Sequence, residues 1–460
     1  MSIATEITRI SGAKADIKSA IESRGVAVST SAKIDTYADL IKAIGDEPDS
    51  KDINFFDYDG TLLYSYTADE FQTVSTLPPN PQHTGLIAQG WNWTLADIKM
   101  VTSSSNRPDQ RYLNVGQNYT TDDGKTRLYL RFPRSSSVTT VWFNVEAQGL
   151  PSGKYMTASL DFGDGTSQSF MYNTSASISH SYSNYYPNGG NVVVKLSPQS
   201  GSPGKIILGI TNKQAIIGHT SNNNVYTVTD SGECAMRNLL WKVELGENER
   251  IRYQAFQSCK SLETITIPTG SWSTNIEYPF RECYNLKFVV IPNNDKMVRI
   301  NYMDQCRSLR GVSFPKYVTT IGTNAFYCAY SLKYLSFPKT ITTIGTGGYY
   351  FSEMYAVSGP WDFSTATGST ELSQYSFRAC QGLSKLHLPS STTTIVGEAF
   401  RYMRSLKELI VPCTTPPTLG SANAFIDLPS DYVVKVPAAS VNTYKSASNW
   451  NTIADHIVSM

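Results

Sequence analysis

The stretch Asp57-Tyr-Asp59-Gly60-Thr61 holds the residues of this chain whose types and spacing are best suited to catalysis. Two carboxylates one residue apart can share nucleophilic attack and proton transfer between them. The same residues also fit a structural role, because Asp-Gly is a favoured pair for the type I′ turn of a β-hairpin. Residues 63–66, Leu-Tyr-Ser-Tyr, then continue as a strand. Both a catalytic site and a hairpin turn must therefore be weighed.

The run from Asp57 to Leu62 resembles the nucleophile motif of haloacid-dehalogenase phosphatases. That resemblance implies that Asp57 would attack phosphate and Asp59 would protonate the leaving group. The family also needs a doubly wound sheet, a downstream Lys and a pair of Asp residues that hold magnesium. The sequence offers none of these in the right context, so we expect a hairpin turn without catalytic chemistry.

Other catalytic or metal-binding patterns are also missing from the sequence. The five His residues (His83, His180, His219, His387 and His456) lie far apart without metal-ligand spacing, and the chain has neither a Gly-x-Ser-x-Gly elbow nor a phosphate loop. We therefore predict no enzyme activity, no catalytic residues and no cofactor. Glycoside hydrolysis by two carboxylates that are distant in sequence stays open as an alternative.

Residues 256–412 contain one pattern seven times. Each copy begins with a bulky apolar residue, has Cys or another buried-type residue three positions on, and has Leu or Val three positions later. Most copies end at a Pro. The copies begin at Phe256, Phe280, Met303, Phe326, Phe351, Phe377 and Phe400, which lie 23 to 26 residues apart. A period of this length predicts a solenoid, in which stacked copies share one core that no single copy could form.

Within each copy, the residues between the Leu and the Pro alternate in polarity, as in Leu262-Glu-Thr-Ile-Thr-Ile267. Such alternation predicts a short strand, which the Pro ends because it has no N–H to donate. All seven Cys residues lie from Cys234 onward, and five of them fall at or beside one repeat position. We expect these thiols to be small buried residues, without disulfide bonds or metal.

From about residue 234 to 460 the chain resembles the BspA type of leucine-rich repeat, on runs such as Ala325-Phe326 through Ser331-Leu332 to Pro338. The copy from Phe351 departs from this pattern, since its strand is carried by Trp361 and Phe363 after one inserted residue. We expect a bulge there. Residues 431–437 predict a last strand, and residues 440–457 predict a closing helix with Trp450, Ile453 and Ile457 on its core face.

Residues 1–46 contain apolar residues at helical spacing, and residues 53–102 combine hairpin and aromatic signals that predict a small aromatic-rich α+β module. In that module we expect Trp91 and Trp93 in an aromatic cluster and Thr94 as a helix N-cap. The run from Ile7 to Ile21, with Ala32-Lys-Ile-Asp-Thr-Tyr-Ala-Asp-Leu-Ile, resembles the N-terminal segment of bacteriophage tail-associated proteins. Residues 53–102 look like a second module of such proteins. The resemblance implies that residues 1–46 attach to other virion proteins.

Residues 103–198 predict an all-β domain, and residues 199–233 a connector to the repeats. The segment Ala158-Ser-Leu-Asp161-Phe-Gly-Asp164-Gly-Thr166, followed by His180-Ser-Tyr182, resembles the PKD fold, an immunoglobulin-like β-sandwich. In such domains the Asp residues satisfy backbone N–H groups in a turn. Asp161 and Asp164 are also candidate calcium ligands. The fold class expected is therefore mainly β and modular, with small helical and α+β parts before the sandwich and the solenoid.

The outward-pointing side chains of the repeat strands form a ladder that we expect to bind a large ligand. Its apolar middle is unusual for a solvated face, and the irregular loops offer further contacts. The candidate binding residues are Phe288, Val290, Tyr334, Ser336, Lys385, His387, Trp272, Tyr349, Tyr350 and Tyr355. The alternative is an ordinary β-surface that loops partly cover.

The net charge of +1, with 17% charged residues, gives no electrostatic reason to expect a nucleic-acid partner. The chain lacks an apolar run long enough for a membrane span and an N-terminal secretory signal, so we expect assembly in a cytoplasm. The resemblance to phage tail proteins implies that this is a host cytoplasm and that the chain is located in a virion.

We expect a non-enzymatic phage protein, of the tail-fibre or host-attachment type, that binds a host glycan or surface protein through residues 234–460. One alternative is a structural tail or head-decoration protein, and another is a bacterial BspA-like surface adhesin. A homo-oligomer is compatible with the sequence, although no heptad run specifies one.

Overall fold

The computed structural model describes residues 51–103, 113–134, 140–182, 189–209, 215–217, 236–247, 249–251, 254–270, 279–293, 299–301, 303–322, 324–335, 337, 340–344, 351–357 and 359–460. Lys51–Met460 form one compact unit. The helical segment predicted for residues 1–46 lies outside the described residues. Among those that are described, no helix is both long enough and apolar enough to cross a bilayer.

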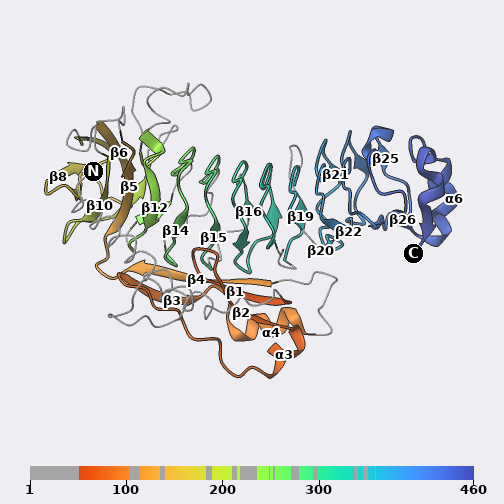
Figure 1. Ribbon diagram of the computed structural model, residues 1–460, viewed down its shortest axis with the longest axis horizontal. Helices are drawn as coiled ribbons and strands as arrows, with labels where there is room; N and C mark the ends of the chain where they lie inside the picture. Colours follow the sequence, from red (N-terminus) through yellow and green to blue (C-terminus); the bar gives the residue numbers. More distant parts are fainter. Residues whose placement is uncertain are drawn as a thin grey trace, which may run out of the picture. The chain divides into compact units, whose positions relative to one another are not determined.

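The first part of the unit is a four-stranded sheet with two short helices, drawn in orange in Figure 1. The sheet has the order β2-β1-β4-β3; β1 is parallel to β4, whereas the outer pairs are antiparallel. Its elements are β1 (Ile53–Phe56), β2 (Leu62–Tyr66), α3 (Ala68–Thr73), β3 (Leu86–Trp91), α4 (Leu95–Thr102) and β4 (Leu113–Thr121). We call residues 51–103 and 113–121 the N-terminal module.

The β1–β2 hairpin turns at Asp59-Gly60, as expected, but only Gly60 of the two residues has a positive φ, so the turn is not of type I′. The Thr94 side chain caps α4 by accepting from the backbone N–H of Asp97, as expected. Phe55 lies in the core of the module with Trp93, and the ring of Trp91 packs against it at 5.0 Å. The position of β4 differs from the prediction. It lies within residues 103–198, which we expected to form the sandwich, but it pairs with β1 and β3 of the module.

The next part is a β-sandwich of two mixed sheets. Its strands are β5 (Thr126–Phe132), β6 (Thr140–Gln148), β7 (Met156–Asp161), β8 (Ser167–Tyr172), β9 (Ser175–Ser181), β10 (Gly190–Pro198) and β11 (Lys205–Leu208). Alternate residues of β5, namely Leu128, Leu130 and Phe132, are buried between the sheets. The all-β prediction for this part of the chain is confirmed.

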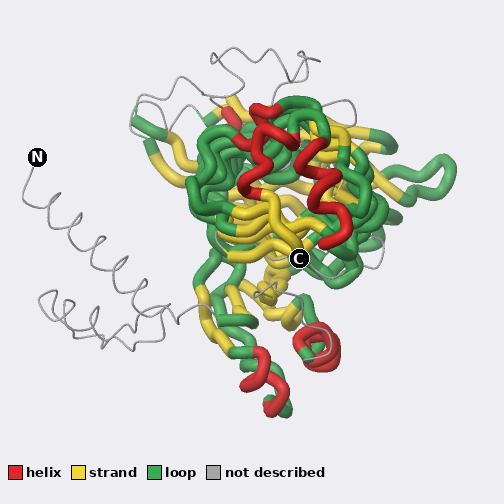
Figure 2. Tube along the Cα trace, turned by 90° about the vertical axis from the view of Figure 1, so that its right-hand side faces the viewer, coloured by secondary structure: helices red, strands yellow, loops and turns green. Residues whose placement is uncertain are grey.

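The repeats then form a solenoid with two lines of parallel strands, which Figure 1 shows from green to blue. The first line is β12 (Leu240–Glu244), β14 (Thr264–Thr266), β15 (Phe288–Val290), β17 (Gly311–Ser313), β20 (Gly359–Asp362), β22 (Leu383–His387), β24 (Glu408–Ile410), β26 (Val433–Val436) and β27 (Ile457–Ser459). The second line is β13 (Glu249–Ile251), β16 (Arg299–Ile300), β18 (Thr320–Ile321), β19 (Thr343–Ile344), β21 (Glu371–Leu372), β23 (Thr394–Ile395) and β25 (Thr418–Leu419). From the end that carries the C-terminus, these strands lie one behind another (Figure 2).

The first line matches the predicted strands. The described residues of the copy from Phe326 contribute an isolated parallel bridge, between Tyr334 and Gly311. In the copy from Phe351 the pairing of β20 with β22 shifts at Gly359 and Pro360, which confirms the expected bulge. The second line was not predicted, although a repeated Thr-Ile pair marks three of its strands.

The sandwich and the solenoid share their sheets. Strand β12 pairs antiparallel with β5 and parallel with β14, and β13 pairs parallel with β11. The sandwich thus covers the open end of the first repeat. One hydrophobic core runs without a break from Leu128 to Ile457.

Successive repeats are held together by rings and thiols at the expected positions. The Phe351 ring stacks on Phe326 and Phe377, with centroid distances of 6.2 and 5.3 Å. The thiols of Cys283 and Cys306 each donate to the carbonyl oxygen of the first residue in the previous copy, at 3.1 Å. All the described Cys residues are buried and free, so the prediction of small buried thiols is confirmed for them.

Each repeat also has one non-glycine residue with a left-handed backbone between its first residue and its Cys position. These residues are Ser258, Glu282, Gln305, Cys328, Glu353, Ala379 and Tyr402, with φ between 57° and 64°. The backbone N–H of Glu282 donates to the carbonyl of Asp304 in the next repeat, at 3.0 Å. Because such a conformation costs about 1–3 kcal/mol, the regular inter-repeat hydrogen bonds must offset it.

The C-terminal cap differs from the single helix expected over residues 440–457. It consists of α6 (Val441–Ser446) and the 3₁₀ helix η7 (Trp450–His456), with η5 (Ala422–Phe425) and η6 (Ala438–Ser440) before them. Ala447, in an extended conformation, ends α6, and Asn449 adopts a left-handed conformation directly before η7. The final strand is therefore β27, which pairs with β26. Trp450, Ile453 and Ile457 are buried, as expected.

Candidate functional site

The carboxylate of Asp57 lies in a buried cluster of hydrogen bonds. It accepts from the hydroxyl of Tyr119 at 2.9 Å and lies 2.7 Å from Nε2 of His83. The backbone N–H of Tyr58 donates to the same carboxylate at 2.8 Å. Asp57 is only 4% exposed. The cluster therefore closes the loop between β1 and β2 against β4 and the chain before β3.

This environment does not suit a phosphatase. The sheet around Asp57 is four-stranded and mixed, and the described residues contain no group of three or more His, Cys, Asp or Glu side chains that could hold a metal ion. Burial, with the nearby carboxylates, raises the pKa of Tyr58 and of Tyr119 far above the usual range, so both phenols keep their protons. The hydrogen bond to Asp57 raises the pKa of His83. The arrangement favours a structural ion pair.

The N-terminal module covers the apolar middle of the predicted binding ladder. Phe288 and Val290 point out of the solenoid, as the alternation requires, but they are only 0% and 3% exposed because Phe56 and Leu62 pack on them. The ring of Phe56 lies 4.8 Å from Phe288 and 5.0 Å from Tyr334. The exposure that we expected for these side chains is therefore corrected: they form an interface within the chain.

Buried amides fix the register of this interface. The side chain of Asn92 donates to the carbonyl of Ile291 at 3.0 Å and to the hydroxyl of Ser313 at 2.9 Å. Asn114 donates to the carbonyl of Tyr334 at 2.9 Å. These bonds use side-chain donors of the module to satisfy backbone acceptors of the repeats, which would be costly to bury unpaired. The indole N–H of Trp93 adds a bond to the carbonyl of Phe314, at 2.7 Å.

The close fit depends on Gly116 in β4. A Cβ atom at this position would lie 2.6 Å from the methyl groups of Val290 and 2.9 Å from the Cβ of Ser313. Contacts of that length do not occur in folded proteins, so the backbone of β4 can lie against the repeats only where the side chain is absent.

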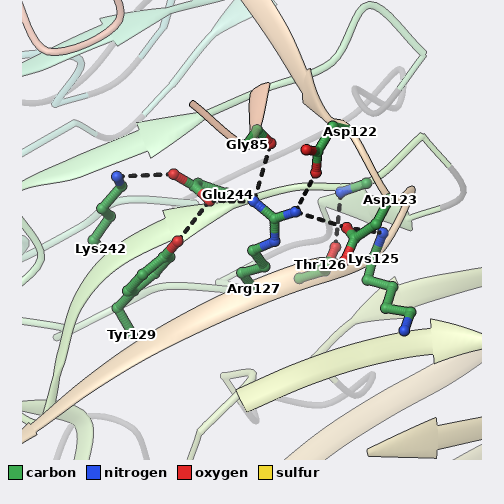
Figure 3. Close-up of polar contacts among 10 residues, drawn as sticks. Gly85, Asp122, Asp123, Lys125, Thr126, Arg127, Tyr129, Lys242 and Glu244 are labelled. Atoms are coloured by element: carbon green, nitrogen blue, oxygen red, sulfur yellow. Dashed lines mark hydrogen bonds and ion pairs between the residues drawn. The ribbon is translucent and has the colours of Figure 1, made fainter. Parts of the chain in front are cut away.

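Arg127 connects the module, the sandwich and the solenoid, as Figure 3 shows. Its guanidinium donates to the carbonyl of Gly85 at 3.0 Å, to Asp123 at 2.9 Å and to Glu244 at 3.3 Å. The carboxylate of Glu244 is buried, and it also accepts from the hydroxyl of Tyr129 at 2.7 Å. Planar donors that point in several directions suit Arg for such a junction. Sequence spacing gave no signal for this cluster.

No described residue of the N-terminal module packs on the second half of the ladder. On its outward face, Glu408 in β24 lies between Lys385 in β22, at 3.2 Å, and Lys435 in β26, at 2.7 Å. His387 lies 3.3 Å from Asp362 of the neighbouring strand. Lys385 and His387 are half-buried by their neighbours and remain accessible. We call the outward side of β20, β22, β24, β26 and β27 the C-terminal face.

The other predicted site residues are scattered. Tyr355 is 44% exposed, and its ring stacks on that of Tyr330 at 5.2 Å. Asp161 and Asp164 accept backbone N–H groups of their own turn, each at 3.0 Å, as expected for a structural turn. Asp164 also pairs with His180 at 2.7 Å. The remaining candidates, Ser336, Trp272, Tyr349 and Tyr350, lie outside the described residues.

We expect the substitution Gly116→Ala to destabilise the protein by about 1–3 kcal/mol, because the new methyl group must displace Val290 or separate the strands. Adding Val290→Ala makes room and should recover part of the loss. Urea unfolding of the two single variants and the double variant measures the coupling. Gly270→Ala is the control, since its Cβ would meet nothing within 4 Å. Additive losses in the double variant would contradict the interface.

The Asp57–His83 pair predicts a pH dependence. Since the folded-state pKa of His83 is raised, its stabilising effect is fully present below its unfolded pKa of about 6.5 and is lost as the pH rises through the folded pKa. The variant His83→Gln cannot titrate. The stability difference between the native protein and this variant, measured by urea unfolding from acidic to alkaline pH, should therefore shrink with rising pH. A difference that grows with pH would contradict the ion pair.

Residues 233–358 and 359–428 match the model of the BspA type leucine rich repeat region, in six copies. No curated protein matches the chain significantly.

Among solved structures, the chain is similar to a leucine-rich repeat protein of T. pallidum, with 23% identity and a TM-score of 0.29. That match covers 36% of this chain and 75% of the other. A leucine-rich cell surface protein of Faecalibacterium prausnitzii has 22% identity and a TM-score of 0.27, over 44% and 69% of the two chains. A leucine-rich repeat protein of Bacteroides ovatus has 15% identity and a TM-score of 0.20, over 57% and 96%.

The family match covers the same repeats in which the structure has stacked parallel strands with inward Phe, Cys and Leu residues. Residues 233–428 are therefore a BspA-type leucine-rich repeat region.

Proposed function

We propose that this chain is a non-enzymatic binding protein of the adhesin type, which attaches to a cell surface through the C-terminal face of its repeats. The observation that carries the proposal is the division of the ladder. The N-terminal module covers β15 and β17, whereas no described part of the chain packs on the outward side of β22 and β24.

The C-terminal face is suited to a large partner. Neighbouring strands lie about 4.8 Å apart, so its five strands give a flat surface roughly 20 Å wide. Flat surfaces of this kind bind extended partners, since they lack the concave walls that enclose a small molecule. Its side chains combine Lys385, Glu408 and Lys435 with His387 and the apolar edge of Ile410. Such a mixture fits the hydroxyl groups of a surface glycan or the polar surface of a protein.

The ion pairs across the strands also hold these side chains in place. Lys385 and Lys435 both bond to Glu408, which prevents either side chain from sampling many rotamers. Although burial alone would raise the pKa of Glu408, the hydrogen bonds from Lys435 and Lys385 keep it below its usual range. An ordered surface loses less conformational entropy when it binds.

A second candidate is the phage virion protein that the sequence suggests. In that proposal residues 1–46 attach to other virion proteins, the chain is located in the virion, and the repeats contact the host or neighbouring virion proteins. The observation that favours it is the resemblance of residues 7–41 and 53–102 to phage tail proteins. The sandwich, which resembles PKD domains, would then be a rigid spacer, and its continuous core with the repeats supports that role.

The test uses the full chain, fluorescently labelled, and intact bacterial cells analysed by flow cytometry. We expect saturable binding, and about a tenfold loss of affinity in the double variant Lys385→Ala/Lys435→Ala, equivalent to about 1.4 kcal/mol. The control Lys154→Ala/Lys445→Ala removes two exposed Lys residues away from the face. Equal binding by both double variants would contradict the proposal. Virion proteins captured by the full chain, but not after removal of residues 1–46, would favour the phage candidate.

A further inference from the structure

One edge of the solenoid carries a row of cations and aromatic rings, one residue from each of the first five repeats. The row occupies the position directly after the Cys position and consists of Lys260, Tyr284, Arg307, Tyr330 and Tyr355. The guanidinium of Arg307 lies 4.3 Å from the ring centre of Tyr284 and 5.9 Å from that of Tyr330. Since a guanidinium stacked on rings can bond only through its edge, its planar donors are directed to the outside of the row.

A second row of cations runs beside the first, three residues further along each repeat. It consists of Lys287, Arg310 and Lys333, whose backbones are bonded in sequence: Arg310 donates to the carbonyl of Lys287 at 2.8 Å, and Lys333 to that of Arg310 at 2.9 Å. Between the two rows lie the accessible polar side chains of Asn285, Ser308 and Ser331.

Three of these cations differ from Lys287 and from the Lys residues of the C-terminal face. Lys287 pairs with Glu263 at 2.7 Å, and the Lys residues of the C-terminal face pair with Glu408. By contrast, Arg307, Arg310 and Lys333 are exposed and make no ion pair with any acidic residue in the described part of the chain. A cluster of three neighbouring positive charges is unfavourable by itself, and an anionic partner would relieve it.

We infer that Tyr284, Arg307, Arg310, Tyr330 and Lys333, with the polar residues between them, form a binding strip for a linear polysaccharide that carries carboxylate groups. The cations recognise carboxylates by charge-assisted hydrogen bonds. Asn285, Ser308 and Ser331 supply donors and acceptors for sugar hydroxyls. Successive contacts at the spacing of the repeats favour a polymer that lies along the solenoid. This inference rests on the proposed function, because it names a ligand class for the cell surface.

The arrangement of the rings argues against nucleic acid as the partner. Single-stranded nucleic acids bind to open aromatic faces on which bases stack. Here a face of Tyr284 is covered by Arg307, and Tyr330 and Tyr355 stack on each other at an interplanar angle of 8°. The strip thus presents edges, hydroxyl groups and cations, which suit sugar acids better than bases.

The test measures binding of the full chain to polygalacturonate by biolayer interferometry, with neutral dextran and double-stranded DNA as comparison polymers. We expect polygalacturonate to bind, dextran not to bind, and DNA to bind more weakly. Binding should weaken as salt rises. The triple variant Arg307→Gln/Arg310→Gln/Lys333→Gln should lose about tenfold or more in affinity, as expected when several charge-assisted contacts are removed.

The control triple variant, Lys154→Gln/Arg134→Gln/Lys445→Gln, removes the same charge from exposed positions outside the strip and should bind as the native chain does. Equal losses in both variants, or no loss in the strip variant, would overturn the inference. DNA binding as tight as that of polygalacturonate would overturn the choice of a polysaccharide.

The cell-binding assay separates this inference from the proposed function. The native chain could bind polygalacturonate, and the strip variant fail to do so, while the native chain binds no cells. That result would support the binding strip and contradict the proposed function. If cells bind through Lys385 and Lys435 while polygalacturonate does not bind at all, the proposed function stands and the strip fails.

Discussion

The stacking of inward side chains between neighbouring repeats is the interaction on which the rest of this structure depends. A single repeat buries almost nothing alone, so each Phe ring must lie against the ring or side chain of the copies on either side. Fully burying one such ring is worth about 1.5–3 kcal/mol, a gain that recurs in nearly every repeat. It also requires that both ends of the stack be closed. The sandwich closes one end through β5 and β11, and Trp450 with Tyr444 closes the other.

This stacking also determines which surfaces can bind a partner. Because the inner side chains fill the core, the outer side chains form rows with one residue from each repeat, and these rows differ in accessibility. The apolar part, around Phe288 and Val290, is covered by the N-terminal module. The charged part, around Lys385 and Glu408, is accessible, and ion pairs hold its side chains in place. The row that includes Arg307 lies on a third surface, where cations have rings for neighbours instead of carboxylates.

Much of the solenoid could be predicted from the sequence because its signals are local and repeated. The period, the inward Phe, Cys and Leu residues and the bulge at Gly359 all depend on spacing within one or two repeats. The cover over Phe288 could not be predicted, since it depends on Phe56 and Leu62, which lie more than 200 positions earlier. The sequence did contain an indication of this cover, because an apolar Phe-Val-Val strand on an outward face needs another surface to pack against. We interpreted that strand as a ligand-binding site. Asp57 and His83 were each noted, but nothing in their spacing indicated that they pair. The rows around Arg307 could have been found by reading one repeat position across the copies.

The central claim, that the N-terminal module covers the apolar half of the ladder and leaves the charged half open, is tested most directly by hydroxyl-radical footprinting of the native chain. Oxidation of each aromatic ring is read by mass spectrometry. The account predicts that Phe288 is protected as fully as the core residue Phe377, while Tyr355 is oxidised readily, because the first two rings are fully buried and the third is 44% exposed. Oxidation of Phe288 at a rate close to that of Tyr355 would contradict it.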